Sequence, residues 1–577
     1  MVDVVFISPN TNGSLAKEAF GILQLATILE KQGISCKLLP FYNIGDPNDL
    51  DVFVSNALSI VKELNPKIVS FYTRCDVYHI DLRLAEQIKK QHSNIYIIFG
   101  GPQSDIVSTE TLKQIKYVDY ICCGEGENTV FPFFSSVLSG NPDHSVAGLV
   151  YREAGEIRKN PRPQLIEDLD SIPLIDYSLF VSEFKNIVSN KDFFPIDVGR
   201  GCPFGCTYCS TKSFWGRHYR LKSPNRIYQE IKELHTGFGL TRFYFTHDMF
   251  TLNRKSVIET CRLLKTLDFD IEWRCSARLD CIDKELIDIM IDAGMKWLFI
   301  GIETGSPRMQ KLINKNLKLD KVVELTSYLS ENNVDTTASF IYGFPEETEE
   351  DLNQTFKLIL QIISLKNITV QTHLCTFLAG TELADKYKDQ LTRTDVYSNI
   401  TGNMAIRECI DLITDYPELF PHMKEYKTEL RTKLRYFTEF FYMFRFMFPV
   451  YSYLGKKYSD NRLLDMYYDF VEANADFLDE LAFMSYSKKY ATLINKDRFY
   501  ERFSSDKNYD IISDIYRLKK TNISDEVKNG QEVTDIYCFS PEELAMNKSI
   551  DDFERCIAVV TSYNNENGVL SYKINKM

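Results

Sequence analysis

The feature that most constrains this chain is a sixfold alternation of short apolar runs with helix-length amphipathic stretches. The apolar runs occupy residues 194–198, 242–246, 272–275, 297–302, 336–342 and 368–375. Helix signals fall between them: Ser223 and Pro224 begin one stretch, and Asp283 and Gly294 delimit another. Strands that alternate with helices build a parallel sheet, so the pattern predicts a partial (β/α)6 barrel with its chemistry at the carboxyl ends of the strands.

A cysteine-rich loop follows the first of these strands. It reads Gly199-Arg200-Gly201-Cys202-Pro203-Phe204-Gly205-Cys206-Thr207-Tyr208-Cys209. Three thiolates from one short loop suit a metal centre, and the glycines let the backbone wrap closely around it. Because the loop offers three ligands and not four, a cubane cluster bound there keeps one iron open.

Two other interpretations of these cysteines are weaker. A structural zinc site takes four closed ligands, usually as two pairs, and no second C-x2-C pair occurs in the 577 residues. A disulfide is disfavoured because the 14 cysteines are scattered and the chain starts without a charged and apolar leader. Scattered cysteines without a leader are typical of proteins of the reducing cytoplasm. We therefore expect a cytoplasmic protein whose clustered cysteines bind a metal cluster.

The C-x3-C-x2-C spacing, with an aromatic residue before the third cysteine, resembles the signature of the radical S-adenosylmethionine (radical SAM) enzymes. The resemblance implies that Cys202, Cys206 and Cys209 hold a 4Fe-4S cluster. It also implies that the open iron chelates the amino and carboxylate groups of S-adenosylmethionine (SAM), and that one electron then splits the sulfonium to give a 5'-deoxyadenosyl radical.

The same resemblance assigns SAM contacts along the barrel. Glu303, in Gly-Ile-Glu-Thr-Gly-Ser, is similar to the family's ribose contact, and Tyr208 would touch the adenine. Ser276 and Arg278 would meet the methionyl carboxylate or neighbouring polar groups. The implied SAM set is Tyr208, Asp248, Ser276, Arg278, Glu303 and Gly343.

Each of these positions has a purely structural alternative. A carboxylate at a strand end often caps a helix or pairs with a cation, and we interpret Glu347 and Asp351 as residues that only favour a helix start. His247 is a candidate proton donor, although a lone histidine is more often structural. The sequence predicts no specific catalytic residue.

The first 140 residues show a second α/β pattern. Continuous apolar strands at 4–7, 36–39, 68–72, 95–99 and 120–123 alternate with helix-length segments, of which the first covers residues 16–32. Strands that are apolar throughout belong in a parallel sheet covered on both faces. We therefore expect a doubly wound, Rossmann-like domain over residues 1–140, with its ligand at the carboxyl ends of the strands.

Two glycine-rich turns lie at those ends, Gly100-Gly101-Pro102 and Gly124-Glu125-Gly126-Glu127. Neither is G-x-G-x-x-G opening a helix, and each alone is more often a tight turn. Ahead of a radical SAM domain, however, these turns and residues 19–26 resemble the cobalamin-binding domain of the cobalamin-dependent radical SAM branch. The implied cobalamin contacts are Ser70, Gly100, Gly101, Pro102, Gly124, Glu125, Gly126 and Glu127.

One departure concerns the loop after the first strand. Cobalamin proteins that ligate cobalt through histidine use D-x-H-x-x-G there, whereas residues 8–13 read Ser-Pro-Asn-Thr-Asn-Gly. The cofactor could bind base-off without a protein imidazole, or the fold could persist without the cofactor. We favour binding.

The other segments are a connector and a C-terminal domain. Residues 141–190 carry Pro161, Pro163, Pro173 and a short strand pair near Val150 and Ile157, which predicts a linker between two rigid bodies. The barrel spans residues 191–395. Residues 396–577 predict a mainly helical domain with a small β end at 533–539, 555–562 and 570–574, suited to substrate binding or to a lid over the barrel.

Composition excludes several other classes of protein. The formal net charge is −13 and no Lys/Arg-rich run occurs, so a nucleic-acid partner is not expected. The most apolar segment, 436–454, contains Glu439 and Arg445, which favours a buried helix over a membrane span.

Together these features predict an α/β enzyme, a cobalamin-dependent radical SAM C-methyltransferase. Its substrate would be an unactivated carbon of a ribosomal peptide or a small natural-product precursor, and its electron donor a flavodoxin or ferredoxin. A cyclase or rearrangement enzyme of the same branch is the nearest alternative. A sensor that holds cluster and cobalamin without turnover is less favoured because no output module is evident, and the three intact cysteines count against a decayed maturation partner.

Overall fold

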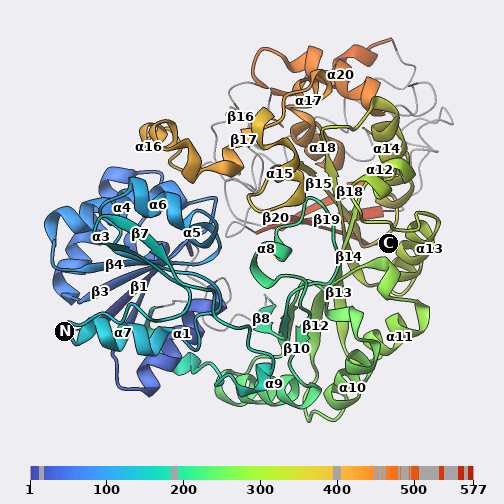
Figure 1. Ribbon diagram of the computed structural model, residues 1–577. Helices are drawn as coiled ribbons and strands as arrows, with labels where there is room; N and C mark the ends of the chain where they lie inside the picture. The colour runs from blue at the N-terminus through green and yellow to red at the C-terminus, as the bar shows by residue number, and fades with distance from the viewer. Residues whose placement is uncertain are drawn as a thin grey trace.

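The computed structural model describes residues 2–11, 18–183, 193–393, 404–446, 451, 458, 463–478, 481, 493, 496–505, 532–537, 557–564 and 569–575. Figure 1 shows two α/β units side by side, an N-terminal one in blue and a central one in green, with the C-terminal helices above the central unit.

The N-terminal unit is built on a seven-stranded sheet of order β2-β1-β3-β4-β5-β6-β7. Its strands are β1 (Val4–Ser8), β2 (Cys36–Pro40), β3 (Ile68–Tyr72), β4 (Tyr96–Gly100), β5 (Tyr120–Cys122), β6 (Leu149–Glu153) and β7 (Glu156–Lys159). The first five are parallel, in the 2-1-3-4-5 order of one common doubly wound fold. The predicted Rossmann-like arrangement is confirmed.

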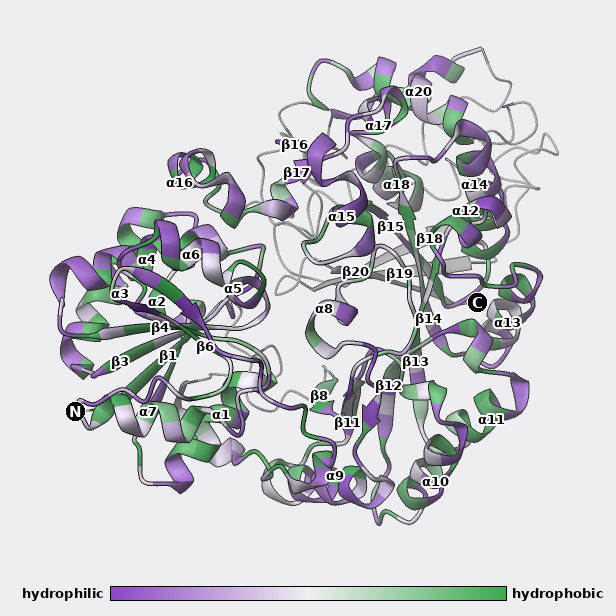
Figure 2. Cartoon of the chain, viewed as in Figure 1, coloured by the Kyte–Doolittle hydropathy of each residue, from purple (hydrophilic) through white to green (hydrophobic). Residues whose placement is uncertain are grey.

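Helices cover both faces of this sheet because its strands are apolar on both sides (Figure 2). Val4 and Phe6 of β1 pack with α1 (Phe20–Lys31) and α7 (Val130–Leu138), whereas Val5 and Ile7 of the same strand belong to the core on the opposite face. The helices in that second core are α2 (Phe41–Ile44), α3 (Leu50–Leu64), α4 (Tyr78–Gln91), α5 (Pro102–Ile106) and α6 (Ser108–Gln114). Alternate side chains of a strand point to opposite faces, which explains the two cores.

The strand pair expected in the connector forms, but it is part of the N-terminal sheet. β6 pairs antiparallel with β5, and β7 pairs with β6. The N-terminal sheet therefore continues to Lys159, beyond residue 140 where we expected the domain to end. A turn at Ala154 and Gly155, both at positive φ, lets the chain reverse so that β7 pairs with β6.

The central unit contains six parallel strands in the order β15-β14-β13-β12-β11-β8, as predicted. They are β8 (Phe194–Asp197), β11 (Arg242–Thr246), β12 (Glu272–Ala277), β13 (Met295–Glu303), β14 (Asp335–Tyr342) and β15 (Ile368–Leu374). The helices α9 (Pro224–Phe238), α10 (Arg254–Leu264), α11 (Lys284–Asp292), α13 (Asp320–Glu331) and α14 (Glu349–Ile363) alternate with the strands. β8 and β15 do not pair with each other, so the barrel is partial.

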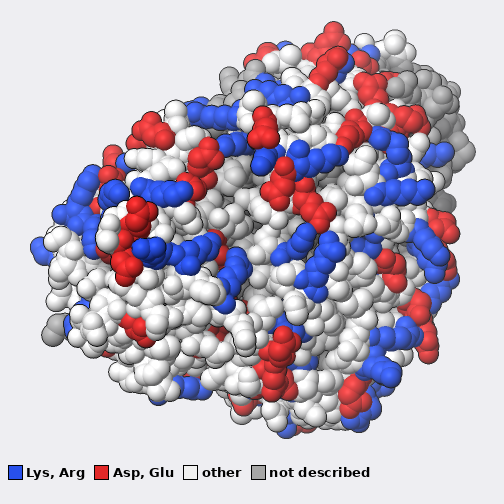
Figure 3. Space-filling model, viewed as in Figure 1, with Lys and Arg blue, Asp and Glu red and all other residues white. Residues whose placement is uncertain are grey.

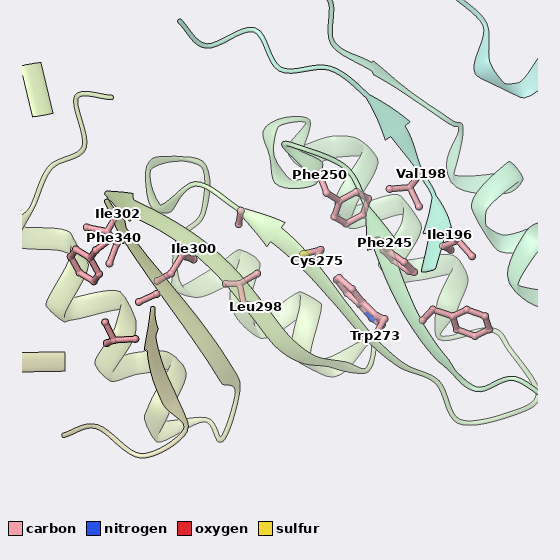
Figure 4. Packing of buried hydrophobic residues seen from close by; sticks show 14 of the residues in the cluster. Ile196, Val198, Phe245, Phe250, Trp273, Cys275, Leu298, Ile300, Ile302 and Phe340 are labelled. Atoms are coloured by element: carbon pink, nitrogen blue, oxygen red, sulfur yellow. The ribbon is translucent and has the colours of Figure 1, made fainter. Parts of the chain in front are cut away.

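Local sequence signals set the helix starts of this unit. The Ser223 hydroxyl accepts a hydrogen bond from Arg226 N at 3.1 Å, and the Asp283 carboxylate accepts one from Leu286 N at 2.9 Å. Between strands and helices lies a continuous apolar layer (Figure 4), in which the Trp273 ring stacks on Phe245 with centroids 4.8 Å apart. This packing holds in place the carboxyl ends of the strands, where the candidate polar residues lie.

The C-terminal third begins with an excursion onto the N-terminal unit. β16 (Thr392–Arg393) pairs antiparallel with β17 (Lys424–Glu425), and residues 404–423 between them, which we call the bridging segment, lie over the N-terminal unit. α16 (Ile410–Asp415) is its helix (Figure 1). Its buried side chains belong to the apolar core of the N-terminal unit, and they are Ala405, Ile406, Cys409, Leu412, Ile413, Leu419, Phe420 and Met423.

Polar contacts complete this docking. The Arg83 guanidinium donates to both oxygens of Asp411 at 2.8 and 2.6 Å, and Gln103 Nε2 donates to Leu419 O at 2.8 Å. The bridging segment falls inside the expected C-terminal domain but packs as part of the N-terminal one, because its apolar side chains join the core to which α4 and α6 also contribute.

Three helices follow: α17 (Glu429–Lys433), α18 (Phe437–Phe446) and α20 (Leu463–Asn474). α18 and α20 pack against the barrel through aromatic side chains, and α17 contacts it through Arg431. Phe437 stacks on Phe356 of α14 with centroids 4.7 Å apart and lies edge-on to Tyr342. The aromatic stripe is therefore core, and α18 is the buried helix expected in the most apolar segment.

The expected β end is a three-stranded antiparallel sheet of β18 (Glu532–Tyr537), β19 (Ile557–Asn564) and β20 (Val569–Asn575). The turn expected at 564–568 lies almost entirely outside the described residues. Among the described helices, none combines the length and the apolar character that a membrane crossing requires. In the view of Figure 3, acidic and basic side chains are interspersed over the surface.

Candidate functional site

A cavity of about 820 Å³ lies between the N-terminal unit and the barrel and is lined by both. From the N-terminal unit come Ser70, Gly100, Gly101, Pro102, Gly124, Glu125, Gly126 and Glu127. From the barrel come Cys202, Cys206, Tyr208, Cys209, Asp248, Ser276, Arg278 and Glu303. The carboxyl ends of the two sheets thus face the same space, and its volume is in the upper part of the range for cofactor pockets.

The cysteine loop owes its path to backbone geometry. β9 (Gly199–Arg200) pairs antiparallel with β10 (Arg220–Leu221), and the chain turns at Gly201, which has φ +84°. A Cβ at Gly201 would lie 1.9 Å from His218 O, so only glycine fits there. Thr207 N donates to Ile313 O at 3.0 Å, and this bond fastens the second half of the loop to the barrel.

The three thiols of this loop are partly exposed and line the cavity. Burial raises the pKa of the Cys202 thiol to about 11, and the charges of Cys209, Asp248 and Cys206 add to this rise. Among the described residues no three His, Cys, Asp or Glu side chains converge on a single metal ion. Three thiols of one loop that line the same cavity suit a polynuclear cluster, in which each sulfur would bind a different iron.

Arg278 connects the third barrel strand to this loop. Its guanidinium carbon lies 3.8 Å from the centroid of the Phe204 ring, and Nη1 approaches Cys206 Sγ at 3.6 Å. Asp280 pairs with the same guanidinium at 2.8 Å. The positive charge of Arg278 therefore lies beside the cysteine loop. There it stabilises thiolate sulfur and anionic groups of a ligand.

Glu303 and Tyr208 meet on the barrel side. Glu303 ends β13 with φ +69°, a conformation that costs a residue other than glycine about 1–2 kcal/mol. Its carboxylate pairs with Lys315 Nζ at 2.9 Å and hydrogen-bonds to the Tyr208 phenol. The Tyr208 ring packs edge-on to Phe344 with centroids 5.9 Å apart. The predicted ribose and adenine contacts are thus neighbours.

Asp248 and Ser276 line the same cavity. Burial raises the pKa of Asp248, although the Thr211 hydroxyl and Gly201 N donate to its carboxylate and oppose that rise. Asp248 therefore supports the cysteine loop directly. Ser276 points into the cavity from β12, two residues before Arg278.

Gly343 is not among the residues that line the cavity, and its place in the SAM set stays a prediction. Its main-chain groups are occupied: Gly343 N donates to the Glu347 carboxylate, and Arg431 Nη1 donates to Gly343 O at 2.6 Å. The turn after β14 is thereby held to the C-terminal helices by Arg431, and Phe344 beside it packs on Tyr208 of the cysteine loop.

Glu347 and Asp351, expected to favour a helix start, have different roles. Asp351 forms a capping box with Thr348 at the start of α14, as expected. Glu347 instead turns back and accepts the hydrogen bond from Gly343, and burial raises its pKa to about 8.

We predict that Glu347 makes stability depend on pH. Its pKa is about 8 in the folded chain and 4.5 ordinarily, so between these values the folded chain keeps a proton that the unfolded chain releases. Stability should therefore fall by about 3 kcal/mol as pH rises from about 5 to 8. In Glu347→Gln the amide oxygen still accepts the hydrogen bond, and urea unfolding should show a flatter pH profile. Parallel profiles for the two proteins would contradict this prediction.

On the N-terminal side the cavity wall includes both glycine-rich turns. Gly101 has φ +95° and a Cβ there would lie 2.9 Å from both Thr73 N and Thr73 O, so the turn after β4 requires glycine. Gly124 has φ +82° and donates its N–H to the Asp105 carboxylate at 3.1 Å. Ser70 reaches the cavity from β3. Glycine turns leave room for a large ligand to approach this wall closely. Residues 12–17, which belong to the loop without a histidine, lie outside the described residues.

The side chains of Glu125 and Glu127 are engaged with the barrel. Arg200 donates to Glu125 at 2.7 Å and to Glu127 at 2.6 Å, and Arg220 donates to both oxygens of Glu125 at 3.0 Å. Both guanidinium groups lie within 6 Å of the Trp215 ring. Sequence reasoning missed this interdomain ion cluster, although Arg200 stands within the cysteine loop.

His247 is a neutral, buried histidine. Its Nδ1 accepts a hydrogen bond from Met249 N at 2.6 Å, and burial lowers its pKa to about 4. The ring packs edge-on to Tyr219 with centroids 5.1 Å apart. His247 also lines the cavity, and its role as a proton donor stays a prediction.

Two family models match the chain. The radical SAM superfamily matches residues 196–359, and the B12 binding domain matches residues 17–131. The first match covers β8 to α14 with all three cysteines, and the second covers both glycine-rich turns.

Similar proteins are found by sequence and by structure. The uncharacterized methyltransferase PH0819 of Pyrococcus horikoshii is 28% identical over 323 residues, which are 56% of this chain and 70% of that protein. The anaerobic magnesium-protoporphyrin IX monomethyl ester cyclase of Rubrivivax gelatinosus is 28% identical over 304 residues, 52% of this chain and only 55% of the cyclase. The cobalamin-dependent SAM radical enzyme OxsB, solved with aqua-cobalamin, superposes with a TM-score of 0.57 at 15% identity, over 95% of this chain and 83% of OxsB. At that identity the structural likeness shows a shared fold.

Proposed function

The chain belongs to the cobalamin-dependent radical SAM enzymes, and we propose from this that it is a C-methyltransferase acting on an unactivated carbon. Its cofactors are a 4Fe-4S cluster, SAM and cobalamin. The proposal is carried by one observation: the cysteine loop, the SAM candidates and the glycine-rich turns all line one cavity.

The bound groups would supply the difficult chemistry: the cluster and SAM provide a carbon radical, and cobalamin provides the methyl group. The protein holds and orients them. Cys202, Cys206 and Cys209 would hold the cluster. Tyr208 and Glu303 would orient SAM.

The two walls of the cavity must also stay in register for these groups to react. Arg200 and Glu125 join the N-terminal unit to the barrel at the cavity edge and are almost wholly buried there, with side-chain exposures of 12% and 2%. A buried ion pair at this place keeps the walls in register and restricts water.

The substrate is proposed as a ribosomal peptide or a small natural-product precursor, and the electron donor as a flavodoxin or ferredoxin. The relatives include both a methyltransferase and a cyclase. A cyclisation or rearrangement is therefore the second candidate. The cytoplasmic location stays a prediction from cysteine usage.

A substrate-free assay tests the function. The protein is reconstituted anaerobically with iron, sulfide and cobalamin, reduced, and given SAM. Methyl transfer predicts two products, S-adenosylhomocysteine from methylation of reduced cobalamin and 5'-deoxyadenosine from reductive cleavage. Deoxyadenosine alone favours the cyclase. Neither product, with intact cluster and cobalamin, favours the sensor and contradicts the proposal.

A further inference from the structure

A short loop after α12 (Pro307–Leu312) contacts the cysteine loop, Arg278 and Glu303. It comprises residues 313–316, Ile-Asn-Lys-Asn, and we call it the hub loop. Ile313 O accepts from Thr207 N at 3.0 Å, and Asn314 Nδ2 donates to Gly205 O at 2.8 Å. Two bonds therefore fasten the hub loop to the cysteine loop.

Arg278 is tied to the same loop. Its Nη2 donates to Lys315 O at 2.7 Å, while the opposite side of the guanidinium lies against Phe204 and Cys206. Arg278 therefore contacts both the main chain of Lys315 and the cysteine loop.

The side chain of Lys315 reaches the other end of the site. Its Nζ pairs with Glu303 Oε1 at 2.9 Å, and the two side chains are only 7% and 9% exposed. A Cβ at Gly301 would lie 2.4 Å from Glu303 Oε1 and 2.9 Å from Lys315 Nζ, so the pair occupies the space that a side chain would fill. Lys315 and Glu303 both line the cavity.

Buried glutamine Gln310 makes this arrangement rigid. Its Nε2 donates to Ile302 O at 2.8 Å and to Thr304 O at 2.7 Å, on either side of Glu303. Its Oε1 accepts from Leu317 N at 3.0 Å. The strand end that carries Glu303 and the hub loop that carries Lys315 are therefore held by one side chain. Asn314 and Asn316, both in the left-handed region, give the loop the turns that present Lys315.

We propose that Lys315 is a positioning residue for SAM. It holds the Glu303 carboxylate toward the cavity at a fixed distance from the cysteine loop, so that the nucleoside end of SAM is bound in register with the cluster. This inference rests on the proposed function, which assigns Glu303 to SAM. Lys315 itself acts through Glu303 and the hub loop, not through the cluster.

The test measures SAM binding and iron content of the anaerobically reconstituted protein. Lys315→Met keeps the length of the side chain and removes the charge, and Glu303→Gln keeps the shape of its partner. Each single variant should weaken SAM binding roughly tenfold to a hundredfold, because a buried charged hydrogen bond is lost and its partner is left alone. Iron content should stay at the parent level.

The double variant gives the sharper readout. If Lys315 acts through Glu303, adding Lys315→Met to Glu303→Gln should cause no further loss, because the interaction is already broken. Lys315→Arg should restore most of the affinity, and Lys318→Met, an exposed lysine of the same segment, should bind SAM like the parent.

Several outcomes would overturn the inference. Additive losses in the double variant would show that Lys315 acts independently of Glu303. Loss of iron in Lys315→Met would show that the hub loop only supports the cluster. If Glu303→Gln bound SAM with the affinity of the parent protein, Glu303 would have no role in SAM binding. Lys315, which acts through Glu303, would then have none either. None of these results touches methyl transfer itself, which the parent protein's two products test separately.

Discussion

Replacing Cys206 by alanine is expected to remove the brown iron–sulfur chromophore and the formation of 5'-deoxyadenosine. Only three cysteines line the cavity wall formed by the cysteine loop, and each would bind one iron. Loss of an outer partner of a metal ligand alone costs about 10–100-fold in affinity or activity, so loss of a ligand should exceed a hundredfold. Iron analysis and the visible spectrum of the reconstituted protein measure the effect.

Cobalamin binding should survive this change. The implied corrin contacts at Ser70, residues 100–102 and residues 124–127 belong to the N-terminal unit, whose core does not include the cysteine loop. Cys36→Ala, on β2 and remote from the cavity, is the matched control and should keep iron and product formation. A Cys206→Ala protein that still produced deoxyadenosine, or a parent protein that carried zinc, would contradict the metal assignment.

Replacing Arg220 by methionine is expected to destabilise the protein by about 3 kcal/mol, because it leaves a buried carboxylate short of a cation. Glu125 is 2% exposed and Arg220 4% exposed at the side chain. Burial alone would raise the pKa of Glu125, but hydrogen bonds from Arg220, Ile166 N and Arg200 outweigh it and lower that pKa. The carboxylate therefore depends on its donors.

Chemical unfolding and cobalamin titration measure this effect. Because the pKa of Glu125 is lowered in the folded state, the stabilisation is present at neutral pH and should fade as the solution is made acidic. Arg217→Met is the matched control: Arg217 pairs with Glu382 at 3.2 Å, and both side chains are nearly half exposed. That pair should contribute less than about 1 kcal/mol. If Arg220→Met and Arg217→Met were equally stable, the interdomain ion cluster would contribute little to the free energy of unfolding.

The periodic features of the chain were predictable from sequence. Alternation of apolar runs and amphipathic helices located all six barrel strands and the first five strands of the N-terminal sheet, because burial on both faces leaves a signal in neighbouring residues. Ser223 and Asp283 marked helix starts because capping is a local interaction. The cysteine spacing located the cluster loop for the same reason.

Features that depend on distant pairing were not predictable. β6 and β7 were expected in a linker, since nothing in their sequence tells which sheet edge they will join. The bridging segment was assigned to the C-terminal domain, because an amphipathic pattern does not tell which domain the segment packs against. Gly343 was assigned to the SAM site from its position in a motif, whereas its contacts with Arg431 and Glu347 are visible only in the folded chain.

The sequence by itself therefore determined the two α/β units, the three thiols and the glycine-rich turns, because each depends on residues close together in the chain. Only the tertiary structure decided that both sets of loops face one cavity, that Glu125 pairs with Arg200 and Arg220, and that Lys315 reaches Glu303. Those contacts join residues far apart along the chain or on opposite sides of a loop, and only packing brings them within hydrogen-bonding distance.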